Sequence, residues 1–297
     1  MPANQTTPNP AKANLATPAT APNPATPTVV PPSRRRLTAR QRSALSTGVQ
    51  YVVLAGVLAA VLLAVNWQQL GSKIFTLAAV RAAAPQIPIA FGNTLRYTLG
   101  AFVVSLSLGL ILALMRLSSV RLYRWLATAY IEFFRGLPAL LIVFAVAYGV
   151  PMALGVKIPG VALKAALALG VVSSAYMAES LRAGLQAVPK GQVEAARSLG
   201  LSHLQTLGLV VIPQAFRIVL PPVTNEIVLL TKDTSLVYVM GLTVADYELA
   251  KLARESLAEP VGGLTALFVI GACYLIITLP LGFLARRMER SFGKAKV

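Results

Sequence analysis

The segment KGQVEAARSLG, residues 190–200, interrupts a chain that is otherwise strongly apolar. Its Glu and Ala residues favour helix, so residues 192–199 are predicted to form a short helix. Glu194 is expected near the start of this helix, where the helix dipole favours a negative charge, and Gly200 is expected to end it. Ser202 precedes Gln205 by three positions, which is the spacing of a capping box. The sequence therefore predicts a helix, a glycine turn and a second short helix.

The alanines of this segment leave a small-residue face that another protein could approach closely. The same pattern is also compatible with an ordinary amphipathic helix that lies on a membrane surface. The local pattern alone does not distinguish these two interpretations, so the sequence of the rest of the chain is needed.

The composition indicates an all-α integral membrane protein. The 297 residues are 56% hydrophobic and 12% charged, with a mean hydropathy of +0.68, whereas a soluble domain carries about 25% charged residues. Apolar runs of roughly 18–20 residues are long enough to cross the hydrocarbon layer. The net charge of +17 comes from basic residues that flank these runs, which is typical of membrane topology signals and argues against nucleic-acid binding.

Six spans are predicted, at residues 49–67, 97–115, 137–156, 161–183, 207–230 and 264–284. The fifth contains Pro213, Pro221 and Pro222 with several polar residues, so we expect a broken or tilted helix that faces the protein interior. Residues 1–33 are rich in Pro, Ala, Thr and Asn and are predicted to be disordered. The basic stretch RRRLTARQR, residues 34–42, precedes the first span and predicts a cytoplasmic N-terminus.

The charges of the loops agree with this topology. The predicted inner segments carry Arg116, Arg121, Arg124, Arg135, Lys190, Arg197, Arg286, Arg287, Arg290, Lys294 and Lys296. The predicted outer segments carry fewer basic residues and four of the ten acidic residues, namely Asp246, Glu248, Glu255 and Glu259. The positive-inside rule therefore places residues 190–200 and the C-terminus in the cytoplasm.

Several motifs carry a resemblance to a known family. EAARSLG, followed by Val210, Ile212 and Pro213, resembles the EAA loop of ABC-type import permeases, with Val and Ile in place of the usual Ile and Leu. Further stretches resemble the permeases of polar amino-acid importers that serve histidine, glutamate, glutamine, arginine and opines. These stretches are NTLRYTL (93–99), YIEFFRGLPALL (130–141), AYMAESLRAG (175–184), VPKGQVEAARSLG (188–200) and PQAFRIVLPPVTNEIVLLTKDTSL (213–236).

The resemblance covers roughly residues 91–287 and implies a division of the chain. A cytoplasmic tail (1–47), an extra N-terminal helix with an outer loop (48–90), the importer transmembrane domain (91–287) with its EAA loop at 188–213, and a cytoplasmic C-terminal tail (288–297) are expected. It also implies the partners: two ATPases, a second permease that is identical or related, and an extracytoplasmic binding protein. The expected location is the bacterial cytoplasmic membrane.

The chain itself is not expected to be an enzyme. No G-x-x-x-x-G-K-[ST] motif occurs, so we expect the partner ATPase to bind ATP and Mg²⁺, with no cofactor on this chain. With one histidine, His203, and one cysteine, Cys273, a metal site built from several such ligands is excluded, and no metal is expected.

Two groups of candidate functional residues follow. For coupling to the ATPase, the resemblance points to Glu194, Ala195, Ala196 and Gly200. For the substrate path, ionisable or polar groups within spans are hypotheses by default, and these are Tyr176, Glu179, Asn225, Lys232, Asp233, Thr234 and Ser235. An amino-acid ammonium needs an acceptor such as Glu179 or Asp233, and its carboxylate needs a donor such as Lys232 or the N-terminus of a broken helix.

Simpler interpretations of these residues stay open. Glu179 and Arg182 could pair along one helix, and Lys232 with Asp233 could anchor a helix end at the membrane interface. For the whole chain, the alternatives are a self-sufficient secondary transporter or channel, and a passive membrane anchor. The first usually shows two similar halves, which we do not find, and a passive anchor would not keep charged groups within its spans.

Overall fold

The computed structural model describes residues 39–74, 76–259 and 263–293 and shows no strand among them. The predicted disordered tail, residues 1–33, lies outside the described residues. The chain divides into two compact units, which end and begin at Ala64 and Val65. The all-α membrane fold predicted from the composition is confirmed, because five helices are long and apolar enough to cross a membrane, or up to six if a bent pair counts as one span.

The first unit contains helix α1, Ala39–Ala64. Its residues Thr47–Ala64 form a candidate span, of which none is buried inside the chain. Val52, Leu58 and Leu63 are among many exposed apolar side chains that point to every side of the helix. A helix that is apolar all round suits a lipid environment.

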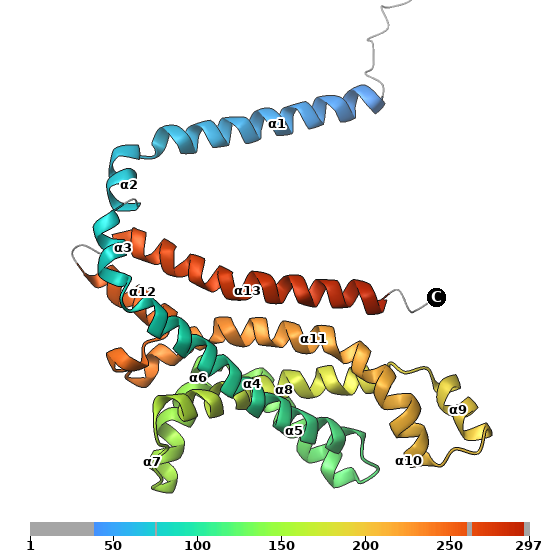
Figure 1. The fold of residues 1–297 in the computed structure, drawn as a ribbon. Helices are drawn as coiled ribbons and strands as arrows, with labels where there is room; N and C mark the ends of the chain where they lie inside the picture. Colours follow the sequence, from blue (N-terminus) through green and yellow to red (C-terminus); the bar gives the residue numbers. More distant parts are fainter. Residues whose placement is uncertain (1–38, 75, 260–262, 294–297) are drawn as a thin grey trace, which may run out of the picture. The chain divides into compact units, whose positions relative to one another are not determined.

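The core of the second unit is a set of long helices that pack side by side (Figure 1). Helix α4 (Ile87–Leu117) lies along α8 (Val161–Gln186), and α11 (Ile212–Asp233) lies between α8 and α13 (Gly263–Gly293). Glycine lets these helices approach closely: a Cβ added at Gly170 would lie 2.5 Å from Val104 Cβ, and one at Gly109 would lie 2.7 Å from Met177 Cγ. Small residues at helix contacts are the usual basis of packing within membranes.

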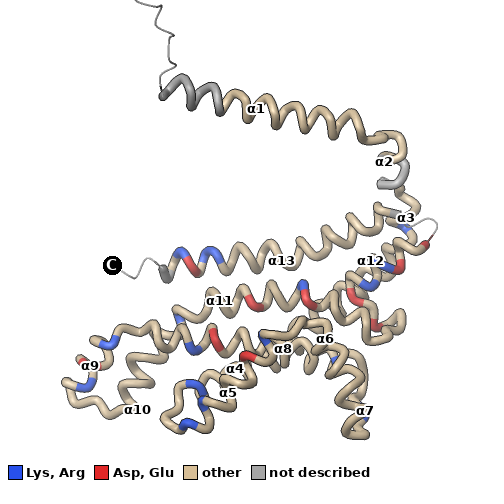
Figure 2. The backbone as a smooth tube through the Cα atoms, turned by 180° about the vertical axis from the view of Figure 1, so that it is seen from behind, with Lys and Arg blue, Asp and Glu red and all other residues tan. Residues whose placement is uncertain are grey.

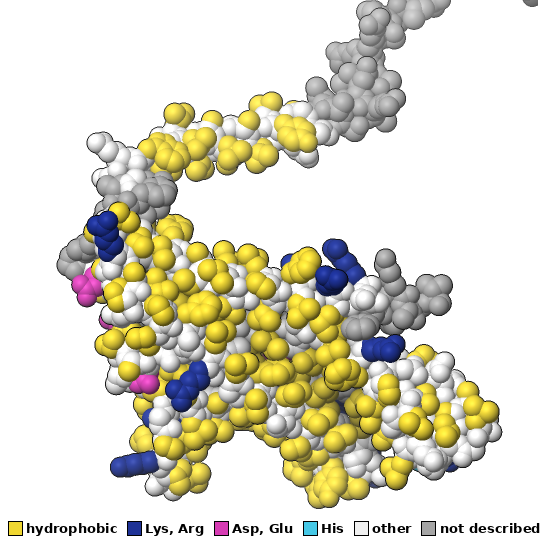
Figure 3. Space-filling model, viewed as in Figure 1, with side chains coloured by type: hydrophobic (Ala, Val, Ile, Leu, Met, Phe, Trp, Pro, Cys, Tyr) yellow, Lys and Arg dark blue, Asp and Glu magenta, His cyan; other side chains and the backbone are white. Residues whose placement is uncertain are grey.

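The outer side of this set is strongly apolar. Figure 3 shows hydrophobic side chains over most of the visible surface of the long helices. In Figure 2, Lys and Arg gather near the N-terminal end of α5 and around α9, whereas several acidic residues lie around α12. The C-terminal part of α13 is also basic and runs to Gly293, so residues 288–293 of the predicted tail belong to a helix.

The predicted third span, residues 137–156, corresponds to a helical stretch at Ala139–Leu154, and the helix before it, α5, was not predicted as part of a span. The structure has α5 (Arg121–Gly136) and a second helical stretch, Ala139–Leu154, which meet at a bend of 109°. This stretch comprises α6 (Ala139–Phe144), a π turn (Ala145–Gly149) and α7 (Val150–Leu154). The bend has a local cause: Pro138 disfavours helical geometry at the residue before it, and Leu137 is extended, with φ −100° and ψ 145°.

The fifth span was predicted to be broken or tilted, and of these two alternatives the break is wrong. His203–Met240 is one helical run of 38 residues that contains α10 (His203–Thr206), a π turn (Leu207–Val211), α11 and a 3₁₀ turn (Thr234–Met240). Pro221 and Pro222 lie inside α11, which continues through them. The wide turn precedes Pro213 instead, because a proline ring collides with the carbonyl four residues earlier, and a π turn makes room for it.

The same run does not face the interior of the chain as expected. Most of its residues are exposed or half-buried, and the buried ones in α11 are Ala215, Val219, Thr224, Val228, Leu230 and Thr231. One side of α11 therefore packs on α8 and α13, and the rest of its surface is available to lipid or to another subunit.

Side chains of α4 hold the segment that follows the 3₁₀ turn. Asn93 Nδ2 donates to the carbonyls of Ala245 and Tyr247, at 2.8 and 2.9 Å, and Tyr97 donates its hydroxyl hydrogen to the Asp246 carbonyl at 2.9 Å. The Leu249 amide donates to Thr94 Oγ1 at 3.1 Å. The polar residues of the NTLRYTL motif thus share one helix face and fix the start of α12 (Leu249–Ala258).

Glu248 is the buried carboxylate of this region. Its side chain accepts hydrogen bonds from the amides of Ala250 and Lys251, both at 2.6 Å, and from the Tyr274 hydroxyl at 3.0 Å. The residue is fully buried, and burial raises the pKa of the Glu248 carboxyl above its ordinary value, which these hydrogen bonds offset in part. Glu248 therefore caps α12 and ties it to α13.

Candidate coupling loop and intramembrane charge cluster

The first half of the predicted coupling loop is helix α9, Lys190–Ser198. Gly200 has φ +87°, its amide donates to the Arg197 carbonyl at 3.0 Å, and the Leu201 amide donates to the Ala196 carbonyl at 3.2 Å. These two bonds form a Schellman motif, so the predicted glycine end is confirmed. The helix begins two residues earlier than the predicted residue 192, so no acidic residue lies in its first turn, and the expected dipole role of Glu194 is wrong.

The second half of the loop begins with the predicted capping box. The Ser202 hydroxyl accepts from the Gln205 amide at 3.3 Å, and Gln205 Oε1 accepts from the Ser202 amide at 2.8 Å. Helix α10 then continues through the π turn into α11. A continuous helical backbone therefore connects α10 to a span.

The loop presents polar and apolar groups together. Glu194 and Ala195 are exposed, whereas Ala196 is 5% exposed and packs inward. Leu199 and Leu204, on either side of the glycine turn, are 83% and 78% exposed. Large apolar side chains this exposed are typical of a protein–protein contact when they cluster.

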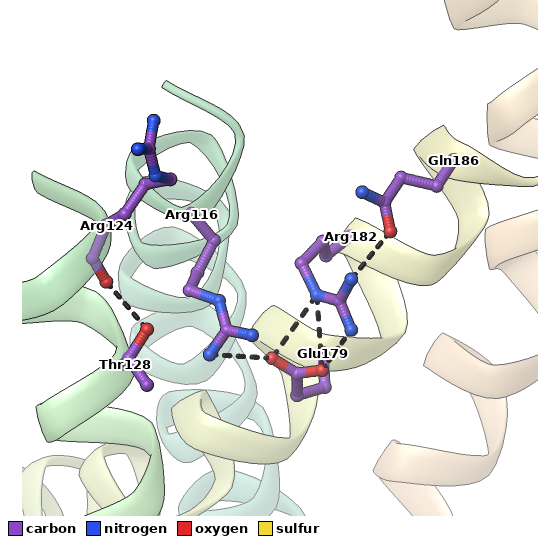
Figure 4. A network of polar contacts seen from close by, with 6 residues as sticks. All are labelled: Arg116, Arg124, Thr128, Glu179, Arg182 and Gln186. Carbon is purple, nitrogen blue, oxygen red and sulfur yellow. Dashed lines mark hydrogen bonds and ion pairs between the residues drawn. The ribbon is translucent and has the colours of Figure 1, made fainter. Parts of the chain in front are cut away.

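Glu179 lies in a cluster of arginines at the ends of α4 and α8 (Figure 4). Its carboxylate accepts from Arg182 Nη2 at 2.6 Å and lies 3.6 Å from Arg116 Nη1. Arg182 also donates to Gln186 Oε1 at 2.6 Å, and the Arg135 guanidinium lies 5.5 Å from the centre of the Tyr176 ring. Pairing of Glu179 with Arg182, the simpler of the two predicted roles, is therefore what the structure contains.

The structure does not bring the predicted substrate residues together. Helices α8 and α11 are antiparallel, since Ser173 contacts Glu226 and Gly184 contacts Val219. Asp233 lies two turns beyond Glu226, away from Glu179, so these two carboxylates are separated by roughly 20 Å along the helices. Tyr176 and Glu179 thus lie toward one end of the spans. Toward the other lie Lys232 and Asp233 in the last turn of α11, with Thr234 and Ser235 just after it.

The exposure of these residues also differs. Asn225 and Lys232 are exposed, Asp233 and Ser235 are half-buried, and Thr234 is buried, with its hydroxyl donating to the Thr231 carbonyl at 2.7 Å. Asn225, Lys232, Asp233 and Ser235 can therefore reach a ligand or a second subunit, whereas Thr234 is occupied with the backbone.

A polar connection across three helices was missed by the sequence reasoning. Ser105 of α4 donates to Ser173 of α8 at 2.9 Å, and Ser173 donates to Glu226 Oε1 of α11. The one signal in the sequence was a glutamate within the fifth span, and its partners could be known only from the packing. Among the described residues, no group of three His, Cys, Asp or Glu side chains could hold a metal ion.

Comparison with known proteins assigns the family. Residues 105–294 match the family described as "Binding-protein-dependent transport system inner membrane component". The "Probable glutamine ABC transporter permease protein GlnM" of Bacillus subtilis (strain 168) is 37% identical, over 68% of this chain and 93% of the relative. The "Arginine transport system permease protein ArtQ" of the same organism is 34% identical, over 70% of this chain and 94% of the relative.

Solved structures agree. "Crystal structure of an amino acid ABC transporter with histidines" matches with a TM-score of 0.65 and 34% identity, over 73% of this chain and 99% of the matched chain. A structure of the MetNI methionine ABC transporter in an inward-facing conformation matches with a TM-score of 0.53 and 19% identity, over 70% of this chain and 95% of the matched chain, and shows the fold alone.

The chain belongs to the family of binding-protein-dependent transport system inner membrane components. It is a multi-pass membrane permease, a transport subunit, and the EAA segment with its coupling helix is a feature of this family. The resemblance inferred from the motifs is thereby confirmed, and the alternatives of a self-sufficient transporter and a passive anchor find no support.

Proposed function

We propose that this permease imports a polar amino acid of the glutamate, glutamine, arginine or histidine type. The observation that carries the proposal is the similarity over more than nine-tenths of the length of GlnM and ArtQ, whose names specify glutamine and arginine. The matched structure of an amino acid ABC transporter supports the same substrate class.

The proposed assembly contains two ATPases, a second permease that is identical or related, and a binding protein outside the membrane. ATP and Mg²⁺ are held by the ATPases, and this chain holds no cofactor. The N- and C-termini lie in the cytoplasm with the α9–α10 loop. The basic residues around α9 and near the end of α13 support this orientation (Figure 2).

In this proposal, Glu194, Ala195, Ala196 and Gly200 couple the permease to the ATPase. Exposed Leu199 and Leu204 add an apolar contact to the exposed Glu194 carboxylate. When the ATPases close, they move α10, and the continuous helix from His203 to Met240 carries the movement into the bilayer. The pathway then alternates between inward-open and outward-open states.

The proposed importer domain comprises residues 91–287 with its coupling loop at 188–213, preceded by the tail (1–47) and the additional helix (48–90). Within this domain, the polar group at the end of α11 is the better substrate candidate. Asp233 has no basic side chain within ion-pairing distance among the described residues, so it is free to accept an ammonium, and Lys232 is exposed. Glu179, in contrast, is already occupied by two arginines.

The test is reconstitution of the permease with its ATPase and binding protein, followed by uptake of a panel of labelled amino acids. We expect ATP-dependent uptake of one polar amino acid or a small set of them. Uptake without ATP would contradict the proposed energy source. If ATP hydrolysis is stimulated by the binding protein but no amino acid of the panel accumulates, the substrate class is wrong and the permease role stands.

A further inference from the structure

An apolar groove lies beside the charge cluster, between α4, α8 and the α10–α11 run. It has a volume of about 720 Å³, and its lining includes Leu114, Leu117, Leu185, Leu207 and Phe216. Leu114 and Phe216 are 55% and 61% exposed, so the groove opens to the surroundings of the helices. Because these residues belong to membrane spans, the medium that reaches the groove is lipid or another protein.

The rim of the groove at the α9 end is polar and cationic. Gln186, His203 and Ser118 line it, Gln186 accepts a hydrogen bond from Arg182, and the Ser118 carbonyl accepts one from Arg124 at 2.8 Å. Arg182 lies one turn before Gln186 on α8, so its guanidinium is at the rim. The apolar lining thus ends at a group of arginines.

The charges of this cluster do not balance. Two guanidinium groups, those of Arg116 and Arg182, pair with the one carboxylate of Glu179, and the guanidinium of Arg135 lies nearby over the Tyr176 ring, so positive charge exceeds negative charge in this cluster. Arg116 Nη1 is buried and lies 3.6 Å from Glu179 Oε1, so Arg116 is held inside the cluster, whereas the Arg182 side chain is partly exposed. An anion beside Arg182 would balance the excess charge, because phosphate oxygens accept charge-assisted bonds from guanidinium groups.

We propose that this groove binds an acidic phospholipid from the leaflet on the α9 side. The acyl chain lies between Leu114 and Leu185, and the phosphate lies against Arg182 at the rim. Charge complementarity selects this occupant over a second permease copy, because an identical rim would bring its own excess of positive charge into repulsion. Basic pockets between transmembrane helices at the cytoplasmic side are known recognition sites for acidic lipid head groups.

The experiment compares phosphatidylglycerol with phosphatidylcholine, each titrated onto the purified full-length chain and counted by native mass spectrometry. We expect wild type to bind phosphatidylglycerol at lower concentration, by roughly fivefold for each arginine that contributes. Arg182→Gln should abolish most of this preference. Leu114→Trp, which fills the groove, should weaken binding of both lipids.

Arg121→Gln is the matched control, because Arg121 is an exposed arginine near the same end of the helices, whereas Arg182 is hydrogen-bonded to Gln186 of the groove lining. It should leave the preference unchanged. Equal binding of the two lipids by wild type, or an equal loss in Arg121→Gln and Arg182→Gln, would overturn the proposal. If Arg182→Gln does not fold, the test uses Arg182→Lys and Leu114→Trp. Arg182→Lys should keep part of the preference for phosphatidylglycerol. Unchanged lipid binding by Leu114→Trp would refute the site.

Occupation of the groove by a second copy of the permease can be detected by cross-linking. In a chain with Cys273→Ser, Leu114→Cys would form disulfide-linked dimers in membranes if another permease covered the groove. We expect no such cross-link, and an efficient one would assign the groove to a subunit contact and overturn the lipid site.

Discussion

Gly184 of α8 lies directly against Val219 of α11, so that a Cβ atom at Gly184 would be 2.0 Å from Val219 Cγ2. The valine side chain is β-branched and has little freedom to turn away. The two helices are therefore held at their present separation by the absence of one methyl group. Along α8, Gly184 lies between the ion-pair cluster around Glu179 and the coupling loop. Val219 lies on α11, the span that continues from α10.

The first prediction concerns this contact. Gly184→Ala should destabilise the protein by about 1–3 kcal/mol, because the added carbon forces α8 and α11 apart, and the loss is measured by thermal unfolding in detergent. Val219→Ala removes the obstructing methyl groups, so the double variant should recover part of the stability. Gly92→Ala is the control, since nothing lies within 4 Å of a Cβ at Gly92. Equal losses in Gly184→Ala and Gly92→Ala would contradict the packing explanation.

The second prediction separates backbone conformation from space at Gly200. Nothing lies within 4 Å of a Cβ there, yet φ is +87°, so Gly200→Ala should cost about 1–2 kcal/mol of local strain and loosen the α9–α10 turn. We expect ATP hydrolysis by the reconstituted complex to continue while uptake falls. Gly200→Asn should be milder, because asparagine tolerates this conformation better, and Gly191→Ala should have no effect. Normal coupled uptake by Gly200→Ala would refute the assignment of this turn to coupling.

The third prediction concerns the Glu179 ion pair. Glu179→Gln leaves two partly buried arginines without their carboxylate, so stability should fall, and a double-mutant cycle with Arg182→Gln should give a coupling of about 0.5–3 kcal/mol. With the binding protein held constant, substrate selectivity should stay as in wild type. A changed selectivity at unchanged stability would instead show that Glu179 contacts the substrate.

The fourth prediction is a pH dependence from Glu248. Burial raises the pKa of this carboxyl above 4.5, so the folded protein holds the proton over a pH range in which the unfolded chain has lost it. The stability that this group contributes is complete below pH 4.5 and declines as pH rises through the folded pKa. Glu248→Gln does not titrate, so the difference in Tm between wild type and variant should narrow as pH rises. A constant difference from pH 4 to 8 would contradict the shift.

The features that were predicted correctly from the sequence depend on interactions between residues close together in the chain. The α9–α10 turn follows from Gly200, Ser202 and Gln205, whose hydrogen bonds span only a few residues, and these signals were read correctly. Most spans likewise follow from hydropathy. The start of α9 was misplaced because the propensity of the residues before Gln192 is weak, and the dipole role given to Glu194 failed with it.

Contacts between distant residues could not be predicted. Arg116 and Glu179 are 63 positions apart, and Ser173 and Glu226 are 53 apart, so only the packing of α4, α8 and α11 reveals them. Helix α5 was not predicted as part of a span, because it is amphipathic and does not stand out as an apolar run. Conversely, the rule that proline breaks helices failed at Pro221, where the packing of α11 on its neighbours outweighs the local penalty.

The two prolines inside α11 also leave two backbone carbonyls in the middle of the span without their usual partners. Neither Pro221 nor Pro222 has an amide hydrogen, so the carbonyl oxygens of Arg217 and Ile218 cannot receive the usual bond from four residues ahead. Hydrocarbon offers no replacement donor. Water, a hydroxyl of a neighbouring helix or a local 3₁₀ or π adjustment of the backbone has to satisfy these oxygens, so the middle of this helix has a hydrogen-bonding requirement that lipid tails alone cannot meet.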